Sequence, residues 1–443
     1  MSIPLNIAKI PELRRRLIFT VLMLAVYRIG VHVPTPGVNG AAIAEYFKSQ
    51  SGTIFGLFNM FSGGALSHLS ILALGVMPYI SASIIFSLLG IVVPSVDRLQ
   101  KEGDAGRKKI NQYTRYTAIL ISVVQAFAIA SGIQHMGNVG GLPVVYNPGV
   151  GFVVVTIITL TCGTAFLMWL GEQITARGIG NGMSLIIFAG IIARLPSGVF
   201  ETIQSIRTEE MSIIFAVVLL LFMFATISAI VFFERGQRRI PVQYAKRVIG
   251  RKMYGGMSSH LPLRINSSGV IPPIFASSIL VFPATAFNFI SPETLHKSQF
   301  LTIIQSLFHS DSVFHNTLYI ALIVFFCFFY TAVTFNPIDV ADNMKRQGGY
   351  IPGIRPGKKT ADYIDDVLTR ITLGGAVYIS VICILPVILS IKANVPFYFG
   401  GTGLLIVVGV ALDTVAQIEA HLISRNYDGF LGAKGMRFKG RRG

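Results

Sequence analysis

Ten stretches of apolar residues, most of them close to the length that crosses a lipid bilayer, alternate with polar segments along the chain. A transmembrane α-helix needs about 20 predominantly apolar residues, because each residue adds only about 1.5 Å along the helix axis. The pattern predicts ten transmembrane helices. They are expected at 17–33, 71–93, 116–133, 150–170, 183–196, 211–233, 269–290, 313–335, 371–391 and 398–418.

The positive charges predict how these spans are oriented. Ten spans place 31 of the 37 Lys and Arg residues in one alternating set of segments and 5 in the other, with Arg28 inside the first span. Lys and Arg accumulate on the cytoplasmic side of membrane proteins. Both termini and the basic segments are therefore predicted to be cytoplasmic. The fifth stretch, 183–196, is short, but leaving it out would put the basic loop 234–268 outside.

Composition indicates the same class of protein. Hydrophobic residues make up 52% of the chain and charged residues 13%, whereas a soluble domain has about 25% charged residues. The net charge of +17 does not indicate nucleic-acid binding, because most aromatic residues lie inside the apolar stretches. Cys162, Cys327 and Cys383 stand singly in such stretches, which is typical of small buried hydrophobes and predicts neither a disulfide nor a metal site.

Two of the predicted spans open on the same interrupted pattern. Residues 75–80 and 269–274 both read G-V-x-P-x-I, and small hydroxyl residues follow each. Each pattern opens the second span of its five-span half, and two halves with an odd number of spans must be inverted relative to each other. Interrupted helices at matching positions point to a central pathway. Simple kinking for helix packing is the alternative.

The segment before the second span, 53–70, is too polar to span alone and too apolar for an ordinary loop. Irregular backbone at membrane depth is tolerated only inside protein or along a water-filled cavity. We therefore predict a re-entrant half-helix. His68 in this segment is interpreted as a polar residue on its surface, with a proton relay or a metal ligand as the alternative.

Candidate catalytic chemistry does not emerge from the motifs. The glycine-rich stretch 178–182 follows a predicted helix rather than a strand, so Asn181 is interpreted as the N-cap of the fifth span. Asp413 lies near the inner end of the tenth span, whereas ion-coupled transporters place acidic or His residues in mid-span. The sequence predicts no enzyme, cofactor or metal site. A small-solute secondary transporter is the alternative function.

Two inner loops, 234–268 and 336–370, are long, basic and rich in Gly and Pro. Loops of this length are usually functional or disordered. One interpretation is an orientation signal alone, and the other is a docking surface for a cytoplasmic partner. Arg355 lies between Gly353 and Pro356, where its guanidinium fork suits carboxylates or an RNA phosphate.

Eight motifs occur in an order that carries a family resemblance. They are 59–66 (NMFSGGAL), 75–83 (GVMPYISAS), 112–116 (QYTRY), 168–175 (MWLGEQIT), 177–182 (RGIGNG), 234–240 (ERGQRRI), 335–337 (FNP) and 352–357 (PGIRPG). With them the chain resembles the SecY family, the pore subunits of bacterial Sec translocons, over nearly its whole length. The resemblance implies an all-α integral membrane protein with ten transmembrane helices in two inverted five-helix halves around a central pore, and with a re-entrant plug helix.

The resemblance also implies the function and its partners. The expected function is a protein-conducting channel that moves unfolded secretory polypeptides across the membrane and releases membrane-protein helices sideways into lipid. The energy would come from the SecA ATPase or the translating ribosome, which could contact the basic loops through rRNA. SecE and SecG are the implied membrane subunits, and signal sequences and membrane lipids are further partners. The implied location is the bacterial inner membrane, with many spans and both termini cytoplasmic.

Carried over motif by motif, the resemblance implies four sets of site residues. The pore ring falls on Val76, Ile80, Met183, Ile187, Ile274 and Ile406. The plug corresponds to Ser62, Gly63, Gly64, Ala65, Leu66, Ser67, His68, Leu69, Ser70, Ile71 and Leu72. The lateral gate would include Ser81, Ile85, Gln125, Ser278 and Phe282. The docking surface would include Arg235, Arg238, Arg239, Lys246, Arg247, Arg251, Lys252, Arg355, Lys358 and Lys359.

The family often has isoleucine where this chain has Val76 and Met183. The two pairs Val76/Ile80 and Met183/Ile187 are each four residues apart, so each helix would present two side chains on one face. The expected organisation follows from the spans. It is a cytoplasmic N-terminal segment at 1–16, a first half at 17–196 with the plug at about 62–72, an outer connection at 197–210, a second half at 211–420 and a basic cytoplasmic tail at 421–443.

Overall fold

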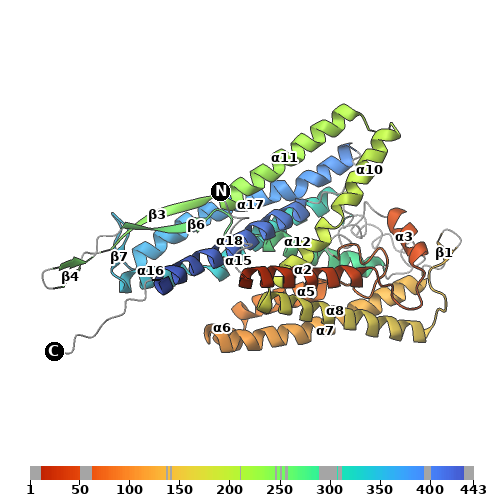
Figure 1. Cartoon of the computed structure of the whole chain (residues 1–443), viewed down its shortest axis with the longest axis horizontal. Coiled ribbons are helices and arrows are strands. Elements are labelled where there is room, and N and C mark those ends of the chain that lie inside the picture. Colours follow the sequence, from red (N-terminus) through yellow and green to blue (C-terminus); the bar gives the residue numbers. More distant parts are fainter. Residues whose placement is uncertain are drawn as a thin grey trace.

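The computed structural model shows a bundle of long helices with small β-sheets at its ends (Figure 1). The structure describes residues 11–49, 62–135, 138–139, 142–209, 211–244, 247–249, 252–254, 258–288, 307, 312–393 and 401–433. The helices of the first half are α2 (Pro11–Val31), α3 (Gly40–Ser49), α5 (Met77–Val92), α6 (Pro94–Lys101), α7 (Asp104–His135), α8 (Val150–Arg177), α9 (Gly182–Ile192) and α10 (Leu195–Arg207). Those of the second half are α11 (Ile213–Arg235), α12 (Ile271–Asn288), α15 (Val313–Thr334), α16 (Pro337–Arg346), α17 (Lys358–Ala393) and α18 (Gly401–Ala433).

Each of the ten predicted spans coincides with a helix. Among the described residues, seven helices are long and apolar enough to cross a membrane, or eight if α5 and α6, which meet at an angle of 102°, form one span. α2 is not among these helices, and α12 contributes a shorter apolar helix over Ile271–Leu280. The fold is that of a multi-pass, mainly helical membrane protein, and the number ten stays a prediction.

The predicted fifth span, 183–196, is longer in the structure. α9 and α10 together run from Gly182 to Arg207 and satisfy the length and hydropathy requirement as one 26-residue segment. The stretch 197–210, expected as a plain connection, is therefore helical as far as Arg207. Asn181 caps α9 as predicted, since its side-chain oxygen accepts hydrogen bonds from the backbone N–H groups of Met183 and Ser184.

The loops contain strands that the all-α expectation missed. β3 (Gln237–Tyr244) pairs antiparallel with β6 (Ser258–Arg264), with Ile240 opposite Leu261, and β7 (Gly349–Tyr350) adds to the other edge of β3. Two further antiparallel pairs are β4 (Arg247–Ile249) with β5 (Lys252–Tyr254), and β1 (Asn138–Val139) with β2 (Leu142–Pro143). The two long inner loops thus build one sheet rather than two separate loops.

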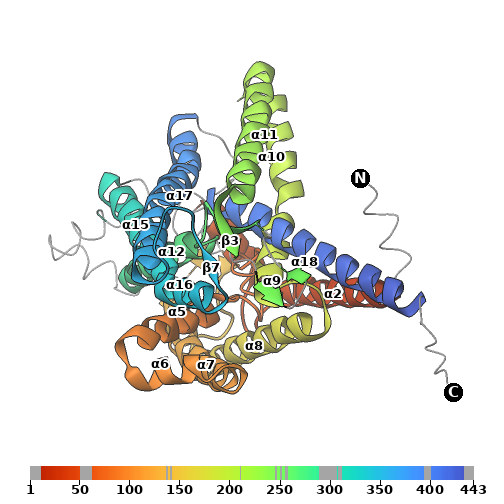
Figure 2. The ribbon, with the colours of Figure 1, turned by 90° about the vertical axis from the view of Figure 1, so that its left-hand side faces the viewer.

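The helices divide into two groups that face each other. In both views α5, α6, α7 and α8 lie on one side, and α11, α15 and α17 lie on the other (Figures 1 and 2). One apolar core belongs mainly to the first half and a second mainly to the second half. Large apolar side chains remain exposed outside these cores. In α11, only 11% of the most apolar 18-residue stretch is buried. Lipid is the medium in which such a surface is stable.

The connecting segments sort to the two ends of the bundle. The sheet β6-β3-β7, α6 and α16 lie toward one end, whereas α3 and the β1–β2 pair lie at the other (Figure 1). The first group comes from segments predicted to be cytoplasmic and the second from segments predicted to be outside. The arrangement is consistent with the predicted alternation of the spans.

Candidate pore constriction, plug and lateral gate

The two interrupted helices have the same local geometry. Gly75 and Gly269 both adopt positive φ, at +57° and +63°, directly before the valine that precedes α5 and α12. This backbone conformation is easily reached only by glycine. A proline follows in the first turn of each helix, where the missing N–H is not needed. The sequence repeat is therefore also a structural repeat. In both copies a glycine in the left-handed backbone conformation lies just before the helix.

A second repeated pattern escaped the sequence analysis. α9 and α18 both open on G-x-x-L-x-I-x-x-G, from Gly182 to Gly190 and from Gly401 to Gly409. A Cβ at Gly182 would meet the carbonyl oxygen of Gly171, and one at Gly401 would meet that of Ile382. Each helix therefore starts against the backbone of the preceding span, and the two helices pack on each other. This second match between the two halves could have been found from the sequence alone.

The six predicted ring residues meet in one apolar cluster. They come from four helix starts, with Val76 just before α5 and Ile80 within it, Met183 and Ile187 in α9, Ile274 in α12 and Ile406 in α18. The exposed fractions of Val76, Ile187, Ile274 and Ile406 are 3%, 5%, 8% and 1%, and Ile80 and Met183 pack against them partly buried. The second repeat makes Ile187 and Ile406 equivalent positions of the two halves.

The predicted plug helix is not a helix in the described part, 62–76. The segment is a series of hydrogen-bonded turns in which Gly63, Gly64 and Leu69 have φ of +68°, +87° and +39°. Successive values of this kind are incompatible with a right-handed helix. Residues 53–61 of the predicted half-helix lie outside the described residues. The segment returns to the region just past α2, because the backbone N–H of Ile71 donates to the carbonyl of Val33. The re-entrant path stays a prediction.

The plug segment fills space beside the ring. Ala65, Leu66, Leu69 and Leu72 are buried in the same apolar cluster as the ring residues. Ser62, Gly63 and Ser70 are also buried. Gly64, Ser67 and Ile71 are half-buried, and His68 is exposed. The segment is thus packed as a core element rather than as a surface loop.

Two polar side chains of α2 hold the plug segment. Nη1 of Arg28 donates to the carbonyl oxygen of Gly63 at 2.9 Å, and the hydroxyl of Tyr27 donates to that of Ser62 at 3.3 Å. Gly63 also abuts the Cα of Gly190 on α9, where neither glycine has room for a Cβ. Arg28, which lies in the first predicted span and had no predicted role, thus satisfies a backbone carbonyl of the plug segment.

His68 lies on the exposed side of the plug segment, as predicted for a polar surface residue. Its ring centroid is 6.3 Å from that of His32. Within the described ranges, no three His, Cys, Asp or Glu side chains lie close enough together to hold a metal ion.

The predicted seam lies where α5 meets α12. The two helices are in contact, and Ile84 of α5 is buried in a cluster with Phe275 and Leu280 of α12. Ser81 is half-buried, and the hydroxyl of Ser278 donates to the carbonyl of Ile274 at 2.7 Å. The seam joins the two halves through one helix from each.

Other predicted gate residues occupy different surroundings. Ile85 is 41% exposed. Gln125 lies on α7, which packs on α5, and its Oε1 is buried without a hydrogen-bond partner in the described part of the chain. The side chain of Phe282 lies outside the described residues, although its backbone belongs to α12.

Six of the ten predicted docking residues have described side chains, and they lie on or next to one small sheet. This sheet, β6-β3-β7, packs on α16 and α17 through Ile240, Val242, Leu263 and Ile364. Arg235, Arg238, Arg239, Arg355, Lys358 and Lys359 are all exposed there. Arg247 and Lys252 belong to β4 and β5, with side chains outside the described residues, and Lys246 and Arg251 lie outside them altogether.

The turn that carries Arg355 is fixed by its backbone. Gly353 and Gly357 adopt φ of +83° and +102°, and the hydroxyl of Thr360 donates to the Arg355 carbonyl at 2.9 Å. β7 ties the turn's approach to the hairpin, because the Tyr350 hydroxyl donates to Gln243 Oε1 at 3.1 Å. The guanidinium of Arg355 is thus presented on a defined turn.

A cavity of about 750 Å³ opens beside the break of α12. Its polar walls include Glu234, Arg239, Asn266 and Asp413. Val270, which also packs against the ring cluster, lines it as well. The cavity therefore extends from the β3–β6 hairpin to a residue that packs against the cluster of predicted ring residues. Asp413, expected near water at the inner end of its helix, lines this cavity rather than a coupling site in mid-span.

The sequence matches proteins of one family. The family model described as SecY matches residues 70–415. The chain is 49% identical over 430 residues to the protein translocase subunit SecY of Escherichia coli strain K12, covering 97% of this chain and 96% of that protein. It is 50% identical to the protein of the same name from Vibrio cholerae, and there too the coverage is 97% and 96%.

Solved structures share the fold at low sequence identity. One described as a protein conducting channel has a TM-score of 0.64 at 17% identity and covers 95% of this chain and 97% of its own. Sec61 in a canine ribosome-channel complex from the endoplasmic reticulum has a TM-score of 0.60 at 16% identity, with coverage of 95% and 97%. These values establish a common architecture of the chain and these channels.

Proposed function

The chain belongs to the SecY family and is a protein-conducting channel of the membrane, and from that premise we propose that its six-residue apolar cluster is the seal of the pore. The observation that supports the seal is the convergence of ring side chains from four helix starts related by two repeated patterns. A narrow apolar constriction resists wetting and so impedes ions, while its side chains can part around a peptide. The substrate is an unfolded polypeptide.

The test of the seal is a polar substitution in the ring. On a lipid-facing or ordinary packing surface, Ile406→Asn or Ile274→Asn would cost insertion or packing energy and little else. In a seal, the amide would let water bridge the constriction, so the variants conduct ions at rest and accept substrates with defective signal sequences. Ile406→Leu and Ile274→Leu, which stay apolar, should do neither. Single-channel recording on reconstituted protein decides: correctly inserted Asn variants as silent as the parent would remove these residues from the seal.

The plug segment is proposed to close the outer side of the same constriction. Its leucines share the ring's cluster, and its backbone is held by Arg28 and by the end of α2 rather than by a helix of its own. Hydrogen-bonded turns have fewer internal bonds than a helix, so the segment can leave the pore without unfolding a regular element. Displacement by a passing polypeptide is the proposed opening step.

The seam between α5 and α12 is proposed as the lateral gate. One helix from each half meets there, and both begin at a glycine turn that can absorb a change of helix direction. Parting the two helices would open the pore toward lipid, where an apolar signal sequence or membrane-protein helix is stable. The chain is thus divided at about 197–210 into two halves that move against each other.

The basic sheet is proposed as the docking surface for the energy source. The chain performs no bond chemistry in this function, so energy must come from a partner such as the SecA ATPase or the ribosome, the latter through rRNA phosphates on the exposed arginines. SecE and SecG are the proposed membrane subunits, on the apolar surfaces that remain exposed. One solved neighbour is described as a ribosome-channel complex, which supports this assignment.

The proposed orientation places the chain in the bacterial inner membrane with both termini and the sheet in the cytoplasm. The excess of Lys and Arg in the inner segments supports it. A reporter active only in the cytoplasm should work when fused within 234–268 or 336–370 and fail within 135–149 or 291–312. Activity at 135–149 would contradict the ten-span arrangement.

A further inference from the structure

Two of the sequence motifs that the pore does not use meet in the structure. The motif at 112–116 lies on α7 and the motif at 168–175 on α8, more than fifty positions apart in the chain. We propose that the ion pair between Arg115 and Glu172, which joins these motifs, positions the ring side chain Met183 and the gate helix α5, and so keeps the resting pore sealed. The inference rests on the proposed seal and adds two positioning residues to it.

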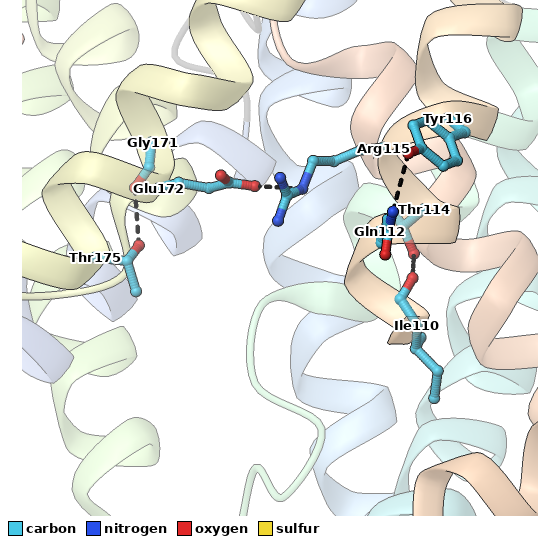
Figure 3. Close-up of polar contacts among 8 residues, drawn as sticks. All are labelled: Ile110, Gln112, Thr114, Arg115, Tyr116, Gly171, Glu172 and Thr175. Atoms are coloured by element: carbon cyan, nitrogen blue, oxygen red, sulfur yellow. Dashed lines mark hydrogen bonds and ion pairs between the residues drawn. The ribbon is translucent and has the colours of Figure 1, made fainter. Parts of the chain in front are cut away.

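The pair itself is well formed. Nε of Arg115 lies 2.8 Å from Oε1 of Glu172, and the side chains point toward each other from neighbouring helices (Figure 3). Their side chains are 45% and 39% exposed, so solvent screens the attraction and the pair contributes little to global stability. Both residues belong to segments predicted at the cytoplasmic side. The pair is therefore suited to fixing a geometry rather than to holding the fold together.

Glu172 lies on α8 between Gly171 and Thr175, which contact the start of α9. Gly171 touches the sulfur of Met183, where a Cβ would lie 2.8 Å from Sδ. The hydroxyl of Thr175 donates to the Gly171 carbonyl and accepts the backbone N–H of Gly182, both at 2.9 Å. The last turns of α8 thus position the start of α9, which includes the ring residue Met183. A tilt of α8 at Glu172 would move Met183.

Arg115 stands beside the contacts that place α5. A small apolar cluster joins Ala82 of α5, Ala118 of α7 and Met168 of α8, and both Tyr79 and Met183 pack against it. In the chain, Tyr79 directly precedes the ring residue Ile80. The ion pair lies at the polar edge of a cluster that contacts two of the four ring-bearing elements.

The other ion pairs of the described residues are of a different kind. Arg16 pairs with Glu12 and Lys101 with Asp97, each four residues apart on one helix. The pair of Arg115 and Glu172, in contrast, joins two helices. The Lys101–Asp97 pair is also 2.8 Å long and exposed, and it lies on α6, which carries none of the predicted ring or gate residues. It provides a matched control with the same chemistry in a different place.

The experiment is a charge swap read out as resting ion current and as translocation of a substrate with a defective signal sequence. Arg115→Glu and Glu172→Arg each place two like charges side by side. Each should raise both readouts about fivefold, the factor expected at the upper end for a partly exposed pair. The double variant Arg115→Glu/Glu172→Arg restores the attraction with the charges exchanged, and it should return both readouts toward the parent. Rescue would show that the effect comes from the attraction between the two side chains rather than from either side chain alone.

Several results would overturn the proposal. Single variants as tight as the parent, or a double variant as leaky as the singles, would reduce the pair to a surface contact. The same swap at Asp97 and Lys101 should change neither readout. Arg115→Gln, which removes the charge without repulsion, serves where the reversals fail to insert, and it should leak less than Arg115→Glu. Ile406→Asn in the same assay separates the two claims, because a silent Ile406→Asn channel contradicts the seal, whereas a leaky one beside tight pair variants contradicts only the positioning role.

Discussion

The two halves of the molecule carry different structures at the same place in their repeat. In the first half, the segment between the first and second helices contains α3 and the plug turns, which pack beside the ring. In the second half, the corresponding segment, between α11 and α12, is the β3–β6 hairpin, which projects from the opposite end of the bundle (Figure 1). Inversion of the halves accounts for the opposite ends. In the proposed function, one insertion closes the pore from outside and the other receives partners inside.

The two halves share the glycine-led starts of their helices, but different contacts hold these starts in place. The glycine turns before α5 and α12 match, and so do the glycine-led starts of α9 and α18. The turn at Gly75 is held by backbone bonds of the plug, with its N–H donating to the Leu72 carbonyl. The turn at Gly269 is held by a side chain instead, because Asn266 donates both to the Gly269 carbonyl and to Glu234. The shared part defines the pore, and the divergent part defines what each side of it does.

The largest expected effect comes from fixing the two halves to each other. Cysteines at Ser81 and Phe282, in a background with the exposed Cys162 replaced by alanine, should form a disulfide across the seam on oxidation. Translocation should stop and return on reduction, because the halves can no longer part. Single-cysteine variants under the same oxidant control for side reactions. Efficient cross-linking with undiminished transport would show that the halves separate elsewhere.

The next effect distinguishes the basic end of the bundle from the other end. Arg355→Glu and Arg355→Lys should both lower SecA-driven translocation while the protein inserts normally. Loss of a charge-assisted hydrogen bond costs about 1.5–3 kcal/mol, which corresponds to roughly tenfold or more in docking affinity. Arg207→Glu, an exposed arginine at the end of α10, is the control and should leave translocation unchanged. Normal secretion with Arg355→Glu would remove this residue from the docking surface.

The spans were predictable because lipid imposes a simple requirement. A helix must satisfy all its backbone groups internally and present apolar side chains over about 20 residues, and both features are local. The paired glycine–proline turns were predictable for the same reason. The ring residues could be assigned only through the family resemblance, since convergence of four distant helix starts is a property of the tertiary structure. The structure places the six in one apolar cluster, and their role as a pore ring stays a prediction.

The strands and the non-helical plug segment were missed although the sequence contains signals for both. Ile240, Val242 and Tyr244 alternate with polar residues along β3, which is the period of a half-buried strand. The Pro and Gly content of the loop concealed that alternation. The plug was expected to be helical from its apolar character, but two consecutive glycines at positive φ redirect the backbone. The inter-helix pair of Arg115 and Glu172 has no local signal, because it depends on how α7 and α8 pack.

The equivalence of the two halves can be tested on their glycines. Gly182→Ala and Gly401→Ala each place a Cβ against a backbone carbonyl that cannot move aside. Each should destabilise the protein by about 1–3 kcal/mol, as overpacking does, and by similar amounts if the halves are equivalent. Gly374→Ala in α17 has open space around it and should be neutral or stabilising by up to about 1 kcal/mol. Thermal unfolding in detergent measures all three, and a neutral Gly401→Ala would break the equivalence.

The smallest effect tests how differently the two glycine turns are held. Asn266→Ala removes donors to Gly269 and to the half-buried carboxylate of Glu234, which lie 3.1 Å and 2.6 Å from the amide nitrogen. Ser70→Ala removes one acceptor, which receives the N–H of Leu72 at 3.2 Å. A neutral hydrogen bond contributes about 0.5–1.5 kcal/mol and one to a charged group about twice that, so Asn266→Ala should cost about 1 kcal/mol more. A double-mutant cycle with Glu234→Gln locates the difference: coupling between positions 234 and 266 is expected, and strictly additive losses would show that the two turns are held alike.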